Sequence, residues 1–221
     1  MNTKVQNEIY LSLLNKFVGQ ETDRVWMNTP FNACEKTIST NGHLLIATPY
    51  QNGFECRDEK VQSVYPFEYN MNFKIPLSEI KEKVKNFPMV DCFDESEVKC
   101  DACDGEGEVS YEFRHRGRFY SAEQECPVCD GQEVIDSGSN VPNGKKEYDT
   151  DMVFKIGECT FSISEIEELV FIAETLQAEY LTIVKQTGRH KPTWFVIKSV
   201  EVLLMPMLTT DEDLIAQIIT I

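Results

Sequence analysis

Two matching cysteine pairs are the strongest chemical signal in the sequence. Cys100 and Cys103 form one C-x-x-C unit, Cys126 and Cys129 form the other, and each unit is followed by Asp-Gly. Two residues between thiolates let both sulfurs face one ion, and the glycine lets the backbone turn around it at low steric cost. Because four thiolates fill a tetrahedral site, the pattern predicts one structural Zn²⁺ ion rather than a catalytic one.

The remaining cysteines carry no such pattern. The sequence has eight cysteines in all, which would also suit a disulfide framework, but such frameworks are typical of small secreted chains and this chain has 221 residues. Metal ligation is therefore the favoured interpretation of the paired cysteines. Cys34, Cys56, Cys92 and Cys159 are isolated and are expected to fill the core as small apolar side chains.

Between the two cysteine pairs lies a short basic segment with aromatic neighbours. Arg114, Arg116 and Arg118 fall at an expected hairpin tip, between Phe113 and the Phe119-Tyr120 pair. Arginine neutralises phosphates and aromatic rings stack on bases, so this tip is the candidate nucleic-acid contact. A solvated turn without a ligand is the alternative interpretation.

The sequence contains little that indicates an enzyme. The three histidines, His43, His115 and His190, are far apart, and the chain lacks an H-E-x-x-H signature, a phosphate-binding glycine loop and a G-x-S-x-G elbow. We therefore expect a binding protein and no catalytic residues. A metal-supported hydrolase built from side chains that meet only in the fold remains a less favoured alternative.

The cysteine pairs and the basic tip must be positioned by a segment that differs in composition from the rest of the chain. We expect residues 96–146 to form an inserted zinc-binding β-hairpin module, which ends in a linker at the Gly-Ser-Asn-Pro-rich run 137–144. Residues 1–95 and 147–221 would then form the main body.

The body shows the hydrophobic periodicities of an α+β fold. Repeated strand-helix-strand units predict an antiparallel sheet with helices on one face. Helices are expected within residues 5–17, 77–88 and 163–176, and strands at 24–31, 37–48, 73–75, 154–156, 180–184, 194–197 and 200–204.

Charge and hydropathy narrow the range of partners. A formal net charge of −16 disfavours attraction of a polyanion over the whole surface, so any DNA contact must be local. The same charge is common in proteins simply because it keeps them soluble. The N-terminus lacks the apolar run of a secretion signal and no apolar stretch reaches about 18 residues, so a cytoplasmic protein with no membrane association is expected.

The cysteine units resemble a known zinc-binding pattern. Residues 98–135 are similar to the cysteine-rich region of DnaJ-type co-chaperones, in which C-x-x-C-x-G-x-G units pair to hold zinc. Those proteins use four units and two ions, whereas this chain has two units, and Glu133 stands where the last glycine is expected. The resemblance implies one zinc ion and does not imply chaperone activity.

Two short motifs in the body resemble bacterial DNA polymerase sliding clamps. One is the Trp194–Met207 run that ends in Met-Pro-Met, and the other is Thr-Asn-Gly-His-Leu at 40–44. The resemblance implies a clamp-like fold, a homo-oligomeric ring around DNA and docking of partner peptides. The chain is shorter than a clamp protomer. Its second expected helix is basic and could face DNA, with Lys81, Lys83 and Lys85. The region of its third expected helix is acidic, which departs from the clamp pattern, with Glu165, Glu167, Glu168, Glu174 and Glu179.

These features together lead to one functional hypothesis. We expect a non-enzymatic, zinc-containing, clamp-like accessory or scaffold protein of DNA metabolism, which acts by binding DNA, protein or both and is encoded by a phage or mobile element. The alternative is a protein-interaction module with a DnaJ-like zinc finger and no nucleic-acid role. A salt-dependent DNA-binding assay separates the two hypotheses.

Overall fold

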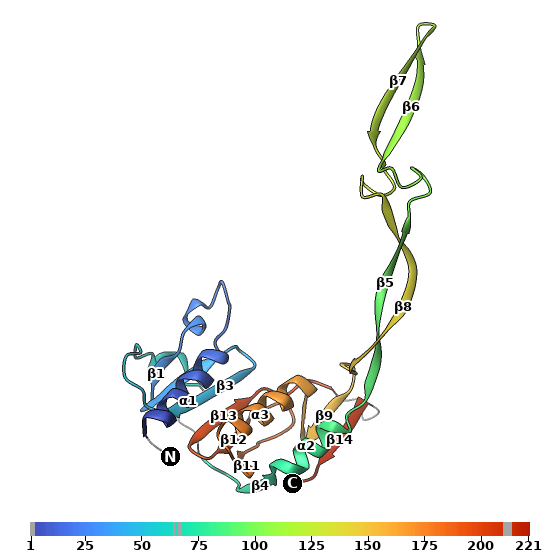
Figure 1. Ribbon diagram of the computed structural model, residues 1–221. Coiled ribbons are helices and arrows are strands. Elements are labelled where there is room, and N and C mark those ends of the chain that lie inside the picture. The colour runs from blue at the N-terminus through green and yellow to red at the C-terminus, as the bar shows by residue number, and fades with distance from the viewer. Residues whose placement is uncertain (1–2, 64, 66–67, 210–213) are drawn as a thin grey trace. The chain divides into compact units, whose positions relative to one another are not determined.

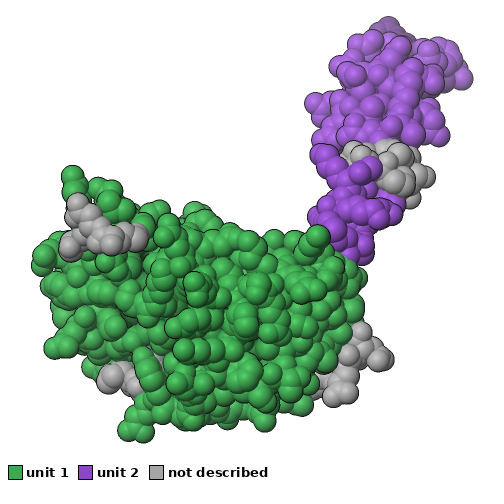
Figure 2. Space-filling model, turned by 60° about the horizontal axis from the view of Figure 1, so that its bottom comes forward, with its two compact units in different colours: residues 1–88, 148–221 green, residues 89–147 purple. Residues whose placement is uncertain are grey.

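The computed structural model describes residues 3–63, 65, 68–209 and 214–221 and divides the chain into two compact units (Figures 1 and 2). The body consists of Met1–Pro88 with Tyr148–Ile221, and the cysteine module consists of Met89–Glu147. Within the described ranges, no helix combines the length and the apolarity needed to cross a membrane.

A large antiparallel sheet forms the centre of the body (Figure 1). Within the described ranges it has seven strands, in the order β1-β2-β3-β13-β12-β11-β4. The β3–β13 pair joins strands from the two ends of the chain, with Leu44 opposite Leu204. The strands are β1 (Phe31–Ala33), β2 (Lys36–Thr40), β3 (Leu44–Pro49), β4 (Phe73–Pro76), β11 (Tyr180–Lys185), β12 (Thr193–Ile197) and β13 (Val200–Leu204).

The helices of the body pack against one face of this sheet. Leu13, Ile80 and Leu169, one from each helix, are fully or almost fully buried in a single cluster with sheet residues such as Phe195 and Val202. The expectation of an α+β fold with helices on one face is confirmed. The helices found in the described ranges are α1 (Thr3–Lys16), α2 (Leu77–Lys85) and α3 (Ile163–Thr175).

The expected strand at 24–31 is wrong over most of its length. Val25–Asn28 form a 3-10 helix, η1, and only Phe31 enters β1. The Met27 carbonyl accepts a hydrogen bond from the Gly19 N–H at 2.9 Å, and Met27 is buried. Met27 is the buried side chain of this segment, whereas the β-forming Val25 is exposed, so the segment closes a local turn and does not pair as a strand. A second 3-10 helix, η2, spans Asp58–Lys60.

A smaller sheet contains the strand that precedes α3. It has the order β10-β9-β14, in which β14 (Ile215–Ile219) runs parallel to β9 (Val153–Ile156). β10 (Cys159–Phe161) forms a hairpin with β9 before α3 begins. The sequence pattern predicted neither β10 nor β14. The unit around α3 is therefore a hairpin, a helix and strands rather than the strand-helix-strand unit that we expected.

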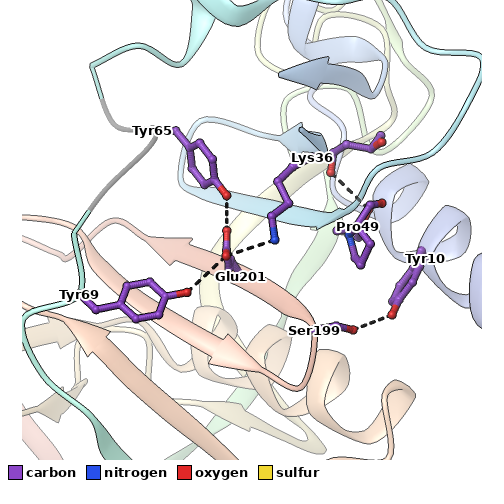
Figure 3. A network of polar contacts seen from close by, with 9 residues as sticks. Tyr10, Lys36, Pro49, Tyr65, Tyr69, Ser199 and Glu201 are labelled. Atoms are coloured by element: carbon purple, nitrogen blue, oxygen red, sulfur yellow. Dashed lines mark hydrogen bonds and ion pairs between the residues drawn. The ribbon is translucent and has the colours of Figure 1, made fainter. Parts of the chain in front are cut away.

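A partly buried carboxylate links residues on the other face of the large sheet (Figure 3). Glu201 of β13 accepts hydrogen bonds from the Tyr65 and Tyr69 hydroxyls and an ion pair from Lys36 at 3.3 Å. Burial and the bond to Glu201 raise the pKa of Tyr65, so its hydroxyl stays a neutral donor. This network anchors the segment after η2 to the sheet.

The N-terminus of α3 carries a capping box. The Ser162 hydroxyl accepts a hydrogen bond from the Glu165 N–H at 3.3 Å, and the Glu165 carboxylate accepts one from the Ser162 N–H at 2.8 Å. Burial raises the pKa of Glu165 by more than the bonds from Ser162 lower it. The folded state therefore binds this proton more tightly than the unfolded state, so its contribution to stability increases as pH falls.

We expect Glu165→Gln to stabilise the body near neutral pH, because glutamine keeps the capping bonds without a buried charge. The difference from the unmodified protein should narrow as pH falls below neutral, because the raised pKa of Glu165 lets this carboxylate take up its proton earlier in the folded state than in the unfolded state. Thermal midpoints of both proteins over this range test it. Exposed Glu158→Gln is the control, and a difference that widens at low pH would contradict the expectation.

The cysteine module consists of two antiparallel ribbons (Figure 1). β5 (Met89–Lys99) pairs with β8 (Val134–Tyr148), and β6 (Glu108–His115) pairs with β7 (Arg118–Glu125). The run 137–144 lies inside β8, so the expectation of a linker there is wrong. Pairing with β5 supplies backbone hydrogen bonds that outweigh the low strand propensity of Gly, Pro, Ser and Asn.

The chain leaves and re-enters the body at adjacent positions. The Asp149 N–H donates to the Pro88 carbonyl at 3.0 Å. Phe87 and Tyr148 pack edge to face with ring centroids 5.9 Å apart. The two ends of the inserted segment are therefore held side by side by contacts within the body.

Candidate functional site

The four predicted cysteine ligands meet at the junction of the two ribbons. Cys100 directly follows β5 and Cys126 directly follows β7, while Cys103 and Cys129 lie in the turns that precede β6 and β8. The four sulfur atoms all lie within 4.8 Å of one another. The spacing in the sequence thus becomes one cluster in space, which can hold a metal ion.

The sulfur positions fit a tetrahedral ion. The Sγ atoms of Cys100 and Cys126 are 3.9 Å apart, and those of Cys103 and Cys129 are 3.7 Å apart. A zinc ion with Zn–S bonds of about 2.3 Å in tetrahedral geometry requires sulfurs about 3.8 Å apart. All four side chains are buried, so the donor set and its spacing suit a structural ion.

Backbone hydrogen bonds relate the two cysteine turns by an approximate two-fold symmetry. The Cys126 N–H donates to the Gly107 carbonyl at 2.8 Å, and the Cys100 N–H donates to the Glu133 carbonyl at 2.9 Å. A Cβ at Gly107 would lie 2.8 Å from the Gly131 carbonyl oxygen, which explains the glycine. Glu133 occupies the equivalent position with φ +69°, a left-handed conformation that is unfavourable for a glutamate.

Protonation of the cluster is uneven. Burial raises the pKa of the Cys100 thiol to about 11. Burial also raises the pKa of the Cys103 thiol. Hydrogen bonds from the Gly107 N–H and the other three thiols outweigh this effect and lower the pKa of Cys103 to about 7. Thiolates are the form that ligates metal, so the first proton leaves this cluster near neutral pH.

The three predicted arginines lie at the tip of the β6–β7 hairpin. Arg116 and Gly117 form the turn, with φ of +49° and +80°, as a two-residue hairpin requires. The Arg114 guanidinium lies 5.4 Å from the centre of the Phe119 ring. All three arginines are exposed, and the eight-residue strands place them about 25 Å from the cysteine cluster.

Other basic residues of the body include one that is paired with a carboxylate and a group that lies in a loop. Lys81 of α2 forms an ion pair with Glu174 of α3 at 2.6 Å, so this lysine is not free to contact phosphate. Arg189, His190 and Lys191 lie in the loop between β11 and β12. Within the described ranges, the cysteines form the one cluster of three or more His, Cys, Asp or Glu side chains able to share an ion.

The two motifs behind the clamp resemblance lie side by side, which sequence analysis did not predict. The Met205 N–H donates to the His43 carbonyl at 2.9 Å, next to the Leu44–Leu204 pair of β3 and β13. Beyond this contact Met205, Met207 and Leu208 are 38%, 39% and 77% exposed. We call these three side chains the apolar strip.

The chain is similar in fold to bacterial β sliding clamps of known structure. A Caulobacter crescentus clamp is 12% identical over 92% of this chain and 64% of that one, with a TM-score of 0.47. A Helicobacter pylori clamp bound to a DNA ligase peptide is 10% identical over 90% of this chain and 62% of that one, with a TM-score of 0.46. A Bartonella birtlesii clamp bound to griselimycin is 10% identical over 93% of this chain and 64% of that one, with a TM-score of 0.47.

The chain thus spans less than two thirds of the length of these clamps, and a likeness at this level does not assign a function. No family model matches the sequence, and no curated protein matches it. The resemblance to DnaJ-type cysteine units therefore stays a prediction.

Proposed function

We propose that this chain is a non-enzymatic, zinc-containing accessory or scaffold protein of DNA metabolism, which acts by binding. The cysteine module holds one structural zinc ion through Cys100, Cys103, Cys126 and Cys129. The observation that carries the proposal is the buried set of four sulfurs at tetrahedral spacing. Such a site has no open position for water or substrate, so its role is to fix the ribbons that meet at the ion.

The hairpin tip supports a nucleic-acid contact within this function. Arg114, Arg116 and Arg118 fall within five consecutive residues and are exposed, in a chain with a formal net charge of −16. Against that background, a local cationic tip is a surface that can approach phosphates without strong repulsion. Zinc at the far end of the same hairpin gives the tip a fixed scaffold.

Replacing Arg114, Arg116 and Arg118 together with glutamine is expected to weaken DNA binding and flatten its salt dependence. Each lost phosphate contact should reduce the slope of log affinity against log salt by about 0.9 on duplex or about 0.7 on single strands. Fluorescence anisotropy across a salt titration measures both quantities.

The matched control replaces exposed Arg189, Lys191 and Lys198 with glutamine, which removes the same charge elsewhere. The control should retain the slope of the unmodified protein. An unchanged affinity and slope in the tip variant would eliminate the nucleic-acid part of the proposal.

The apolar strip favours a second candidate function, protein binding without nucleic acid. Met205, Met207 and Leu208 expose apolar surface beside His43, at the place where the two clamp-resembling motifs meet.

Native mass spectrometry is the first measurement that distinguishes the two candidate functions, since it reports bound metal and subunit number together. One zinc per chain in a ring-sized homo-oligomer would support a DNA-encircling scaffold, whereas one zinc on a monomer would favour the interaction module.

A further inference from the structure

The β6–β7 hairpin separates its side chains by chemistry onto two faces. Cross-strand partners share a face, and the faces alternate along each strand. One face, here called the aromatic face, carries Val109, Tyr111, Phe113, His115, Arg118, Tyr120, Ala122 and Gln124. The other, the acidic face, carries Glu108, Ser110, Glu112, Arg114, Phe119, Ser121, Glu123 and Glu125.

The aromatic face therefore has no acidic side chain, although the protein as a whole is strongly acidic. Every glutamate of the two strands lies on the opposite face. His115 and Arg118 pair across the strands at the tip end of the aromatic face. An anionic ligand that approaches from this side meets the Arg118 guanidinium, the His115 imidazole and the aromatic rings without local repulsion from carboxylates.

The rings on this face are exposed and pre-arranged. Phe113 and Tyr120 stack with centroids 5.3 Å apart and an interplanar angle of 15°. Phe113, Tyr120 and Tyr111 are 53%, 42% and 43% exposed. Tyr111 lies two residues from Phe113 on the same strand, about 7 Å along the ribbon.

Internal packing does not account for these rings. All residues of β7 are exposed, and β6 is exposed apart from the partly buried Val109. A two-stranded ribbon has no core that large side chains could fill. A group of exposed rings next to an arginine is instead typical of a binding surface.

We propose that the aromatic face binds single-stranded nucleic acid by stacking unpaired bases on Phe113, Tyr120 and Tyr111. This inference rests on the proposed nucleic-acid contact at the tip and names its substrate class. His115 and Arg118 would contact the phosphates that follow the stacked bases. Duplex DNA is disfavoured because its base faces are already stacked on one another, whereas an unpaired base has a free face for each ring.

The test uses the full-length, zinc-loaded protein with a labelled oligothymidine and a duplex of the same length. The double variant Phe113→Ala/Tyr120→Ala is expected to weaken oligothymidine binding about tenfold or more, since each stacked base contributes substantially to affinity. The salt slope should stay unchanged, because no phosphate contact is removed.

Tyr50→Ala is the matched control. Tyr50 is 55% exposed, close to the 53% of Phe113, but it belongs to the body and lies outside the hairpin. Its removal should change the affinity less than twofold on the stacking hypothesis. A loss equal to that of the double variant would indicate unselective apolar contact and overturn the inference.

Further variants and measurements distinguish a loss of base stacking from a failure of the double variant to fold. Phe113→Tyr and Tyr120→Phe retain a ring at each position and should retain binding, and zinc content reports whether the module is intact. Photocrosslinking of 4-thiothymidine oligonucleotides to the unmodified protein should label Tyr111, Phe113 or Tyr120. Labelling confined to the acidic face would overturn the inference.

The remaining outcomes separate this inference from the function on which it rests. If the arginine variant loses binding while the double aromatic variant does not, the nucleic-acid contact stands and base stacking is excluded. If the unmodified protein binds neither oligonucleotide at low salt, both proposals fail. Binding to phosphatidylserine vesicles without binding to oligothymidine would assign the rings to a lipid surface and overturn the inference.

Discussion

Removing the metal is expected to unfold the cysteine module and leave the body folded. Among the side chains of the module that the structure describes, no large apolar core surrounds the cysteines, and Val109 and Ile135 are the partly buried hydrophobic residues that pack against the cluster. Structural zinc sites contribute about 10–16 kcal/mol in small zinc-binding peptides, which exceeds what such a cluster can supply by burial. Hydrogen exchange after chelation should show loss of protection in residues 89–147 and unchanged protection in α3 and β13.

Cys126→Ser tests the same expectation without a chelator, because it removes one ligand from the cluster. Cys92→Ser is the matched control, since Cys92 belongs to β5 of the same module but lies outside the sulfur cluster. The first variant should lose tight zinc binding in native mass spectrometry and the second should retain one zinc. A module that stays protected without metal would contradict the structural role of zinc.

Phe195→Ala is expected to destabilise the body by about 3–5 kcal/mol, because it removes a large side chain from a close-packed core. Phe195 is fully buried in β12 and packs edge to face with Phe161 at 6.4 Å. Denaturant titration followed by the fluorescence of Trp194, the adjacent residue in β12, measures the change in unfolding free energy. A zinc-loaded module should persist at denaturant concentrations that unfold this variant's body.

Phe171→Ala is the control for Phe195→Ala. Phe171 lies on α3, is 39% exposed and contacts the Lys16 ammonium at 3.7 Å from its ring centre. Its loss should cost about 1 kcal/mol or less, as expected for a partly exposed cation–π contact. Simultaneous loss of zinc and body structure at one denaturant concentration would show that the two units do not unfold separately.

The cysteine cluster could be predicted because its information is local. Two residues between thiolates and a glycine after them determine the turn geometry within each unit, and the second unit repeats the first. The position of Arg116 at the hairpin tip was predictable for the same reason. The spacing of apolar residues in α1 and α3 likewise predicted these helices, since each helix buries one face.

The errors concern segments whose structure depends on distant partners. The 137–144 run has the composition of a loop, yet it forms part of β8 because β5, about 40 residues earlier, pairs with it. β14 pairs in parallel with β9 about 60 residues away, and no local signal indicates that pairing. The Val25–Asn28 segment has strand-forming side chains, but its backbone bonds to Gly19 and closes a turn.

The separation of aromatic and acidic residues on the hairpin was only partly predictable from the sequence. Alternation along β6 and β7 is present in the sequence, but the two strands share faces only in one register. The Arg116-Gly117 turn sets that register, which places Phe113 opposite Tyr120 rather than opposite Phe119. A shift of one residue would bring the glutamates next to the rings.

The contact between the two ends of the inserted segment bears on how such a protein can evolve. Pro88 and Asp149 are hydrogen-bonded neighbours, and the Phe87–Tyr148 contact lies beside them. A segment whose two ends already touch can be gained, exchanged or lost in one genetic event without altering the register of the flanking strands, as with domains inserted at surface turns. The body and the module can therefore evolve at independent rates, and related bodies are free to carry a plain turn or a different module at this position.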